Sequence, residues 1–211
     1  MSVIDFPART DALAVLQGRD ASILSGIKET GVAAAVWQRA PAPEFANWIA
    51  ELPPENLPKL RSLVGVDALE GCVQAACDIA GTPAGPERDM LAGDIAALGF
   101  LMSEIMNTPL LHVRVEAVTT NACRKFHVDH MIARMLCTYR GTGTQLARPG
   151  AEGAPLDVAT GSAVLLRGRL WPDEEETGLL HRSPPIEGTD ETRLLAVIDP
   201  AMEPESRRRL H

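Results

Sequence analysis

The stretch LLHVRVEAVTT, residues 110–120, is the point where the chain changes from helical to strand-like spacing. Its apolar side chains alternate at Val113, Val115 and Ala117, which is the two-residue period of a strand with one buried face. Similar runs follow, separated by turns rich in glycine, proline and aspartate: RKFHVDH, ARMLCTYRG, GSAVLLRGRLW, GLLHRSPP and TRLLAVID. About six short strands of this kind predict an antiparallel barrel or jelly roll.

The chain before this point has apolar residues mostly at helical spacing. The segments are TDALAVLQ, PEFANWIAEL, LPKLRSLVG, DALEGCVQAACDIAG and ERDMLAGDIAALGFLMSEIM. One exception, GVAAAVWQRA at residues 31–40, suggests an edge strand that joins the later sheet. We therefore predict an α+β fold in which a helical N-terminal half packs on an antiparallel double-stranded β-helix, a jelly-roll or cupin-like core.

This pattern predicts a single domain over residues 1–211, although a separable helical half is an alternative. Residues 1–109 form its mainly helical part, residues 110–200 the jelly-roll core that carries the functional site, and residues 201–211 a C-terminal tail.

The charge and composition narrow the classes of partner. The 211 residues carry a formal net charge of -8, and the one basic cluster is Arg207–Arg209. A nucleic-acid partner is not expected for such an acidic chain. No apolar run approaches the roughly 18 residues of a membrane span, and the N-terminus lacks the basic and apolar regions of a signal peptide. We expect a cytoplasmic protein with no membrane partner; the sequence does not predict an oligomeric state.

The motif HVDH, residues 127–130, carries the most chemical information. On a strand His127 and Asp129 point to the same side, so their side chains can share a ligand. His181 ends another strand-like run 54 residues later, and Arg193 begins the last one. Two imidazoles and one carboxylate suit a non-haem Fe(II) site with open positions. Arg193 offers a bidentate fork for a carboxylate, which Tyr139 could also bind through its hydroxyl.

In this order and spacing the residues resemble the Fe(II)/2-oxoglutarate-dependent dioxygenases over about residues 110–200. The resemblance implies that His127, Asp129 and His181 are the metal ligands and the catalytic centre. It also implies that Arg193 and Tyr139 bind 2-oxoglutarate as cosubstrate. The substrate, a small molecule or a protein side chain, is not specified.

The whole chain also resembles a bacterial family of about this length, catalogued as a domain of unknown function. The stretches that carry this resemblance are VWQRA, CRKFHVDH, CTYRGTGTQ and LLHRSPPIEGTDETRLL. The family's association with zinc-responsive genes suggests a role in metal homeostasis. A second hypothesis is therefore a non-catalytic protein that binds Zn(II) or iron. Cys123, as a soft fourth ligand, and Leu195, where the dioxygenases often have a polar residue, favour this second hypothesis.

A third hypothesis makes the same polar residues a purely structural hydrogen-bond network in an adaptor protein. His130 is expected at the surface or behind the metal ligands, and His112 within the sheet. Arg134 and Arg167 are candidate substrate contacts.

Overall fold

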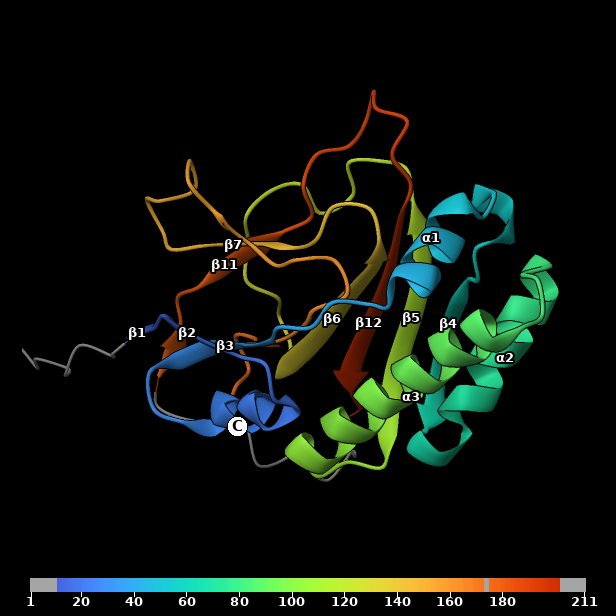
Figure 1. The fold of residues 1–211 in the computed structure, drawn as a ribbon. Helices are drawn as coiled ribbons and strands as arrows, with labels where there is room; N and C mark the ends of the chain where they lie inside the picture. Colours follow the sequence, from blue (N-terminus) through green and yellow to red (C-terminus); the bar gives the residue numbers. More distant parts are fainter. Residues whose placement is uncertain (1–10, 173–174, 202–211) are drawn as a thin grey trace, which may run out of the picture.

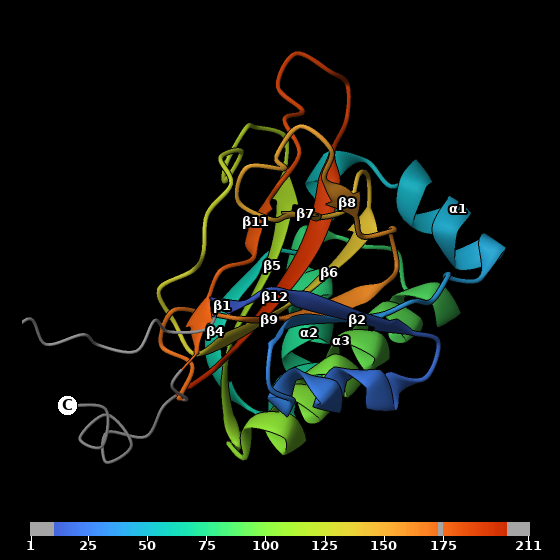
Figure 2. The same cartoon turned by 90° about the vertical axis from the view of Figure 1, so that its left-hand side faces the viewer.

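The fold was analysed in a computed structural model that describes residues 11–172 and 175–201. The tail residues 202–211, with Arg207–Arg209, lie outside this described part. One large sheet forms the centre of the molecule, with the helices on one face and a smaller sheet on the other (Figure 1). Seen from the side opposite the helices, β11, β7 and β8 lie in front of the large sheet (Figure 2).

The large sheet has seven strands in the order β2-β3-β9-β6-β12-β5-β4. All neighbouring pairs are antiparallel except β2 and β3, which are parallel. The last strand in the sequence, β12, is thus an inner strand between β6 and β5. The strands are β2 (Ala14–Gly18), β3 (Val32–Trp37), β4 (Leu60–Gly65), β5 (Leu110–Val118), β6 (Ala133–Arg140), β9 (Ala163–Arg167) and β12 (Arg193–Pro200).

The smaller sheet is antiparallel, in the order β11-β7-β8, with β11 at Leu180–Arg182, β7 at Gln145–Ala147 and β8 at Leu156–Asp157. A further two-stranded pair joins β1 (Asp11–Ala12) to β10 (Glu176–Thr177) in parallel. Buried side chains such as Leu136, Leu146 and Val197 fill the space between the two main sheets. This second core fixes the smaller sheet, and with it β11, over the large one.

Three α-helices cover the other face of the large sheet: α1 (Pro43–Glu51), α2 (Leu69–Ala80) and α3 (Pro86–Met106). Proline occupies the first turn of α1 and α3, where its missing N–H costs no helical hydrogen bond. In α3 the side chains of Leu91, Ile95, Leu98 and Met102 are fully buried, at the spacing of one helix face. Short 3-10 helices occur at η1 (Ala21–Lys28), η2 (Pro54–Asn56) and η3 (Val66–Ala68).

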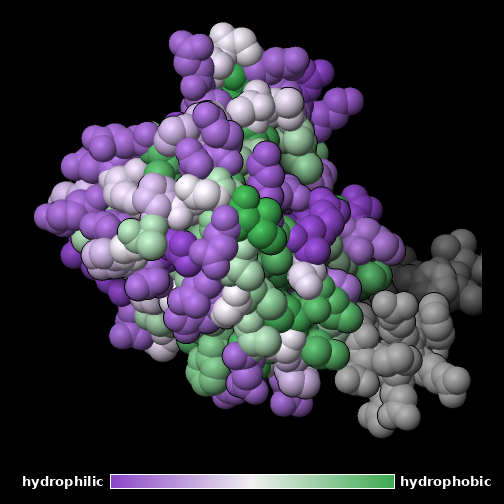
Figure 3. All heavy atoms as spheres, turned by 90° about the vertical axis from the view of Figure 1, so that its right-hand side faces the viewer, coloured by the Kyte–Doolittle hydropathy of each residue, from purple (hydrophilic) through white to green (hydrophobic). Residues whose placement is uncertain are grey.

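The outer surface of α2 and α3 is partly apolar. Figure 3 shows hydrophobic side chains gathered on this side of the molecule, and Ile79, Met90 and Phe100 are exposed. No helix within the described ranges has the length and hydrophobicity needed to cross a membrane.

The structure confirms a mixed α and β fold with a large, mostly antiparallel sheet, but not a helical N-terminal half. TDALAVLQ forms β1 and β2, and LPKLRSLVG forms β4, so both helix predictions were wrong. Backbone pairing with β3 and β5 makes these segments strands, because tertiary contacts override the spacing of a few apolar residues. GVAAAVWQRA does contribute a strand, β3, but between β2 and β9 rather than at the edge.

Candidate metal centre

His127 and Asp129 lie in the connection between β5 and β6. RKFHVDH, predicted as a strand, forms only one isolated antiparallel bridge, in which His127 faces His181 of β11. The His127 N–H donates to the His181 carbonyl at 3.1 Å, and the His181 N–H donates back at 2.9 Å. This single bridge brings together two histidines that are 54 residues apart in the sequence.

The turn after β9 also binds the segment between β5 and β6 that carries Asp129. The Arg169 N–H donates to the Asp129 carbonyl at 2.9 Å, and the Leu170 N–H donates to the Met131 carbonyl at 3.0 Å. Gly168 lies so close that a Cβ atom there would overlap the Met131 carbonyl. The segment that carries Asp129 is therefore fixed by backbone contacts although it is not a strand.

Three ligand atoms, one each from His127, Asp129 and His181, lie within 4.8 Å of one another. The Nε2 atoms of His127 and His181 are 3.5 Å and 3.1 Å from the Asp129 carboxylate oxygens. The His181 side chain is 9% exposed and that of His127 is 35% exposed, so the group is open on one side. Two imidazole nitrogens and a carboxylate that leave further positions free fit Fe(II), and zinc also accepts these donors.

A backbone contact sets the orientation of the His127 ring. Its Nδ1 is 2.8 Å from the Lys125 carbonyl, which can only accept a hydrogen bond. The proton of neutral His127 therefore belongs on Nδ1, and the lone pair on Nε2 is directed towards Asp129 and His181. Such a hydrogen bond behind a histidine ligand is usual at metal sites, because it fixes the tautomer and the ring.

Asp129 is ionised and firmly held. Burial raises the pKa of its carboxyl, but the His181 hydrogen bond and the electrostatic effects of His181, Arg134 and His127 outweigh this, and the pKa falls to about 2. Arg134 Nη1 donates to Asp129 Oδ2 at 2.8 Å. The same guanidinium binds both oxygens of Asp199 on β12, each at 2.8 Å. Asp199 thus positions Arg134, and Arg134 positions the carboxylate.

We expect Asp199→Asn to lower the affinity for a divalent metal by about tenfold, the effect typical of residues that orient a ligand. Without the Asp199 charge, Arg134 shifts towards Asp129 and competes with the metal for the carboxylate. Calorimetric titration with Mn(II) measures the effect, and Asp157→Asn, at an exposed residue of β8, is the matched control. Unchanged metal affinity in Asp199→Asn would show that the position of Arg134 does not depend on Asp199.

Arg193, the first residue of β12, is completely buried. Its Nε donates to the Thr142 carbonyl at 2.6 Å, and its Nη2 lies 3.4 Å from the Thr138 hydroxyl. Burial lowers the pKa of Arg193, an effect that Glu191 and Cys123 partly offset. No carboxylate in the described ranges forms an ion pair with it. A buried guanidinium without a carboxylate in contact is unusual, because removing a charge from water is costly.

Tyr139 is not brought together with the other predicted site residues. It packs in the core beneath the helices, and its hydroxyl donates to Asp94 of α3 at 2.6 Å. Asp94 also binds Arg39, which lies 3.5 Å from the thiol of Cys137. Cys137 and Tyr139 share one face of β6, whereas Leu136 lines the opposite side with the histidines. The prediction that Tyr139 lies beside Arg193 missed this alternation.

A small cavity of about 70 Å³ is lined by two of the three candidate ligands, His127 and His181. Cys123 lines it, but its thiol is not one of the three clustered ligand atoms. Arg167 lies elsewhere and binds the Ile27 and Glu29 carbonyls, so it does not contact this cavity. His130 is exposed, as expected, and His112 lies on β5.

The sequence interpretation missed two residues of β5 that line the cavity and one residue of β12 that positions Arg134. Arg114 and Glu116 both line the cavity, and Asp199 holds Arg134. The two-residue alternation of LLHVRVEAV could have placed Arg114 and Glu116 on the face opposite the buried valines. No sequence signal pairs Arg134 with Asp199, because that contact depends on the register of β6 against β12.

Comparison with solved structures gives matches of low identity. The dioxygenase for auxin oxidation from rice matches with a TM-score of 0.45 at 15% identity, covering 82% of this chain and 74% of that one. A putative oxygenase from Shewanella oneidensis gives 0.46 at 18%, covering 91% of both chains. The dioxygenase for auxin oxidation 1 from Arabidopsis thaliana, in a complex with 2-oxoglutarate, gives 0.43 at 13%, covering 88% and 73%.

No curated protein matches the sequence. A family model described as "Protein of unknown function (DUF1826)" matches residues 18–199, nearly the whole of the described chain. The chain therefore belongs to the DUF1826 family.

Proposed function

We propose that this protein is an Fe(II)/2-oxoglutarate-dependent oxygenase on a jelly-roll core. The observation that carries the proposal is the cluster of His127, Asp129 and His181, with ligand atoms within 4.8 Å. This donor set suits Fe(II) and leaves positions for a chelating cosubstrate and dioxygen. The two facing sheets, with the histidines on the smaller one or bridged to it, agree with a jelly roll.

Arg193 supports 2-oxoglutarate as the cosubstrate. Its guanidinium is buried and lacks a carboxylate partner in the described part of the chain. By strand alternation Arg193 starts from the same face of β12 as Leu195 and Val197. Both of those residues line the cavity beside the histidines. The distal carboxylate of 2-oxoglutarate would supply the missing counter-charge through two parallel hydrogen bonds. Tyr139 has no part in this proposal, because its hydroxyl is bound to Asp94.

The residues of the candidate site would have separate roles. His127, Asp129 and His181 would hold the metal, and Arg134 would keep the Asp129 carboxylate in place. Arg193 would orient the cosubstrate. Iron with 2-oxoglutarate would supply the oxidising chemistry from dioxygen, which protein side chains alone do not provide. The apolar walls at Leu136, Leu195 and Val197 would keep water away from the reacting atoms.

An anaerobic titration tests the proposal. Adding 2-oxoglutarate to the Fe(II)-loaded protein is expected to produce the weak visible absorption band of an iron–2-oxoglutarate chelate. Arg193→Met should bind Fe(II) normally but require at least about tenfold more 2-oxoglutarate, because it loses charge-assisted hydrogen bonds. Circular dichroism checks that the variant folds, and Arg148→Met, at an exposed position, is the matched control. Iron binding without any 2-oxoglutarate band would contradict the proposed function.

A second candidate function is divalent-metal binding without turnover, in metal homeostasis. Two observations favour it: the Cys123 thiol lines the cavity with the histidines, and thiolates prefer Zn(II). The cavity of about 70 Å³ is also far smaller than a usual ligand pocket. Tight Zn(II) binding that weakens in Cys123→Ser, with no response to 2-oxoglutarate, would favour this candidate.

We place the protein in the cytoplasm in either case. All four cysteines carry free thiols, as expected in a reducing compartment.

A further inference from the structure

We propose that the substrate carries an acidic group, a carboxylate or a phosphate, which Arg114 binds at the mouth of the metal cavity. That the bound molecule is a substrate rests on the proposed oxygenase function, whereas the anion site itself does not require a metal. Arg114 lies on β5, lines the cavity with His127 and His181, and keeps 26% of its side chain exposed. It can therefore meet a ligand that extends out of a small cavity.

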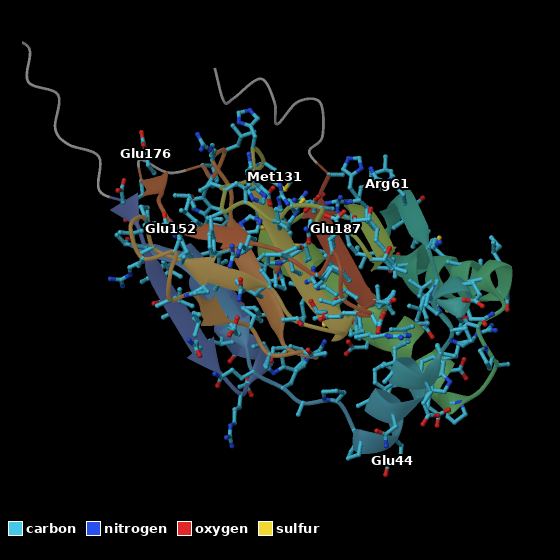
Figure 4. The ribbon with its side chains drawn as sticks, turned by 90° about the horizontal axis from the view of Figure 1, so that it is seen from above. Glu44, Arg61, Met131, Glu152, Glu176 and Glu187 are labelled. Atoms are coloured by element: carbon cyan, nitrogen blue, oxygen red, sulfur yellow. The ribbon has the colours of Figure 1, made fainter. Side chains whose placement is uncertain are left out.

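The register of the sheet leaves positive charge unbalanced around Arg114. On β4 and β5, Arg61 and Arg114 are direct partners, and like charges in this arrangement repel each other. Figure 4 shows Arg61 at the β4 end of the sheet. One carboxylate, Glu116, serves both: it is 2.8 Å from Arg61 but 3.8 Å from Arg114. Glu116 therefore neutralises Arg61 first and leaves Arg114 only weakly paired.

The opposite wall of the cavity adds a second guanidinium. Arg182 of β11 binds the Gln145 side chain through Nε at 2.7 Å and stacks over the Phe126 ring at 4.3 Å. No carboxylate in the described ranges pairs with it. Arg134, the third arginine of the lining, is neutralised by two aspartates. In a chain of net charge -8, two weakly balanced guanidiniums around one cavity point to an anionic ligand.

The register of the sheet also separates Arg114 from Arg134. Val197 is the β12 partner of Arg114, and Leu136 of β6 is the partner of Val197, so Arg114 lies two strands from β6. Two strand spacings are about 10 Å. Arg134, which holds Asp129, begins from β6. Arg114 and Arg134 thus reach one cavity from strands about 10 Å apart, so Arg114 is free to meet a ligand while Arg134 stays on Asp129.

Fluorine NMR with small probes tests the proposal. The probes are 4-fluorophenylacetate and 4-fluorophenyl phosphate, with uncharged 4-fluorophenylacetamide as the matched control. The wild-type protein is expected to bind at least one anionic probe, and not the amide. Arg114→Gln should weaken that binding by at least about tenfold, the effect of losing a charge-assisted hydrogen bond. Glu116→Gln should strengthen it, because Arg114 loses its remaining partial counter-charge. Arg148→Gln makes the same change in net charge at an exposed position away from the cavity and should have no effect.

Mn(II) in place of iron separates this proposal from the oxygenase function. If both hold, Mn(II) speeds the relaxation of the bound probe's fluorine in wild type and Arg193→Met alike. If the anion binds through Arg114 but Mn(II) does not bind, the anion site stands and the oxygenase function fails. The proposal is overturned if Mn(II) binds but neither anionic probe is preferred to the amide. It is also overturned if Arg114→Gln binds the anionic probe as well as the wild type does.

Discussion

Replacing His181 with alanine is expected to lower the affinity for Mn(II), Fe(II) and Zn(II) by more than about 100-fold, beyond the usual effect of residues behind the ligands. His181 is the least exposed of the three candidate ligands, and its Nε2 lies 3.1 Å from the Asp129 carboxylate. Without the His181 imidazole, only His127 and Asp129 would remain to bind the metal. Calorimetry or the electron paramagnetic resonance signal of free Mn(II) gives the affinity directly.

His130→Ala is the matched control, because His130 neighbours the site in sequence but is exposed and lies outside the candidate ligand group. It should bind metal as the wild type does. Equal loss in both variants would indicate unfolding, which circular dichroism detects. If His181→Ala retained wild-type affinity, the cluster of His127, Asp129 and His181 would be a structural hydrogen-bond network.

Gly168→Ala is expected to destabilise the fold by about 2–3 kcal/mol, the cost of forcing an extra carbon into a packed site. The new methyl group would meet the Met131 carbonyl, which belongs to the segment that carries Asp129. Thermal unfolding should show a midpoint lower by roughly 5–10 °C for a chain of this length. Metal affinity should fall as well, because relief of the overlap moves Asp129 away from the histidines.

Gly93→Ala provides the comparison for this effect. Gly93 lies within α3, and a Cβ atom there would have no neighbour within 4 Å. Alanine favours a helix over glycine by about 0.5–1 kcal/mol, so this variant should be slightly more stable than wild type. If Gly168→Ala unfolds at the wild-type temperature and binds metal normally, the turn after β9 does not fix the Asp129 segment.

The sequence predicted the candidate ligands better than the elements that hold them. His127, Asp129 and His181 were recognisable by residue type and order, and they lie together in the structure. The predicted strand around HVDH is absent; one bridge and the hydrogen bonds from the turn after β9 hold this segment instead. Local patterns report the chemistry of a motif more directly than the long-range contacts that position it.

Two misjudgements share one cause. Helical spacing was assigned to TDALAVLQ and LPKLRSLVG, and Tyr139 was placed beside Arg193, although strand register decides both. Leu194 faces Arg140 and Leu195 faces Thr138, a register shift between β12 and β6 that no local pattern reveals. Pairing between strands distant in sequence depends on the complete sheet, so it could not be inferred from any one segment.

The inner position of β12 affects how the protein is made. Its neighbours β5 and β6 are translated some 50 to 80 residues earlier, and until β12 leaves the ribosome each exposes an unpaired edge. Translation adds only about 5–20 residues per second, so these edges stay open for seconds. Arg193 and Asp199 arrive with the same strand, so the nascent chain closes its sheet and completes its candidate metal site in one late step. Premature termination before β12 would therefore yield an aggregation-prone product without a complete site.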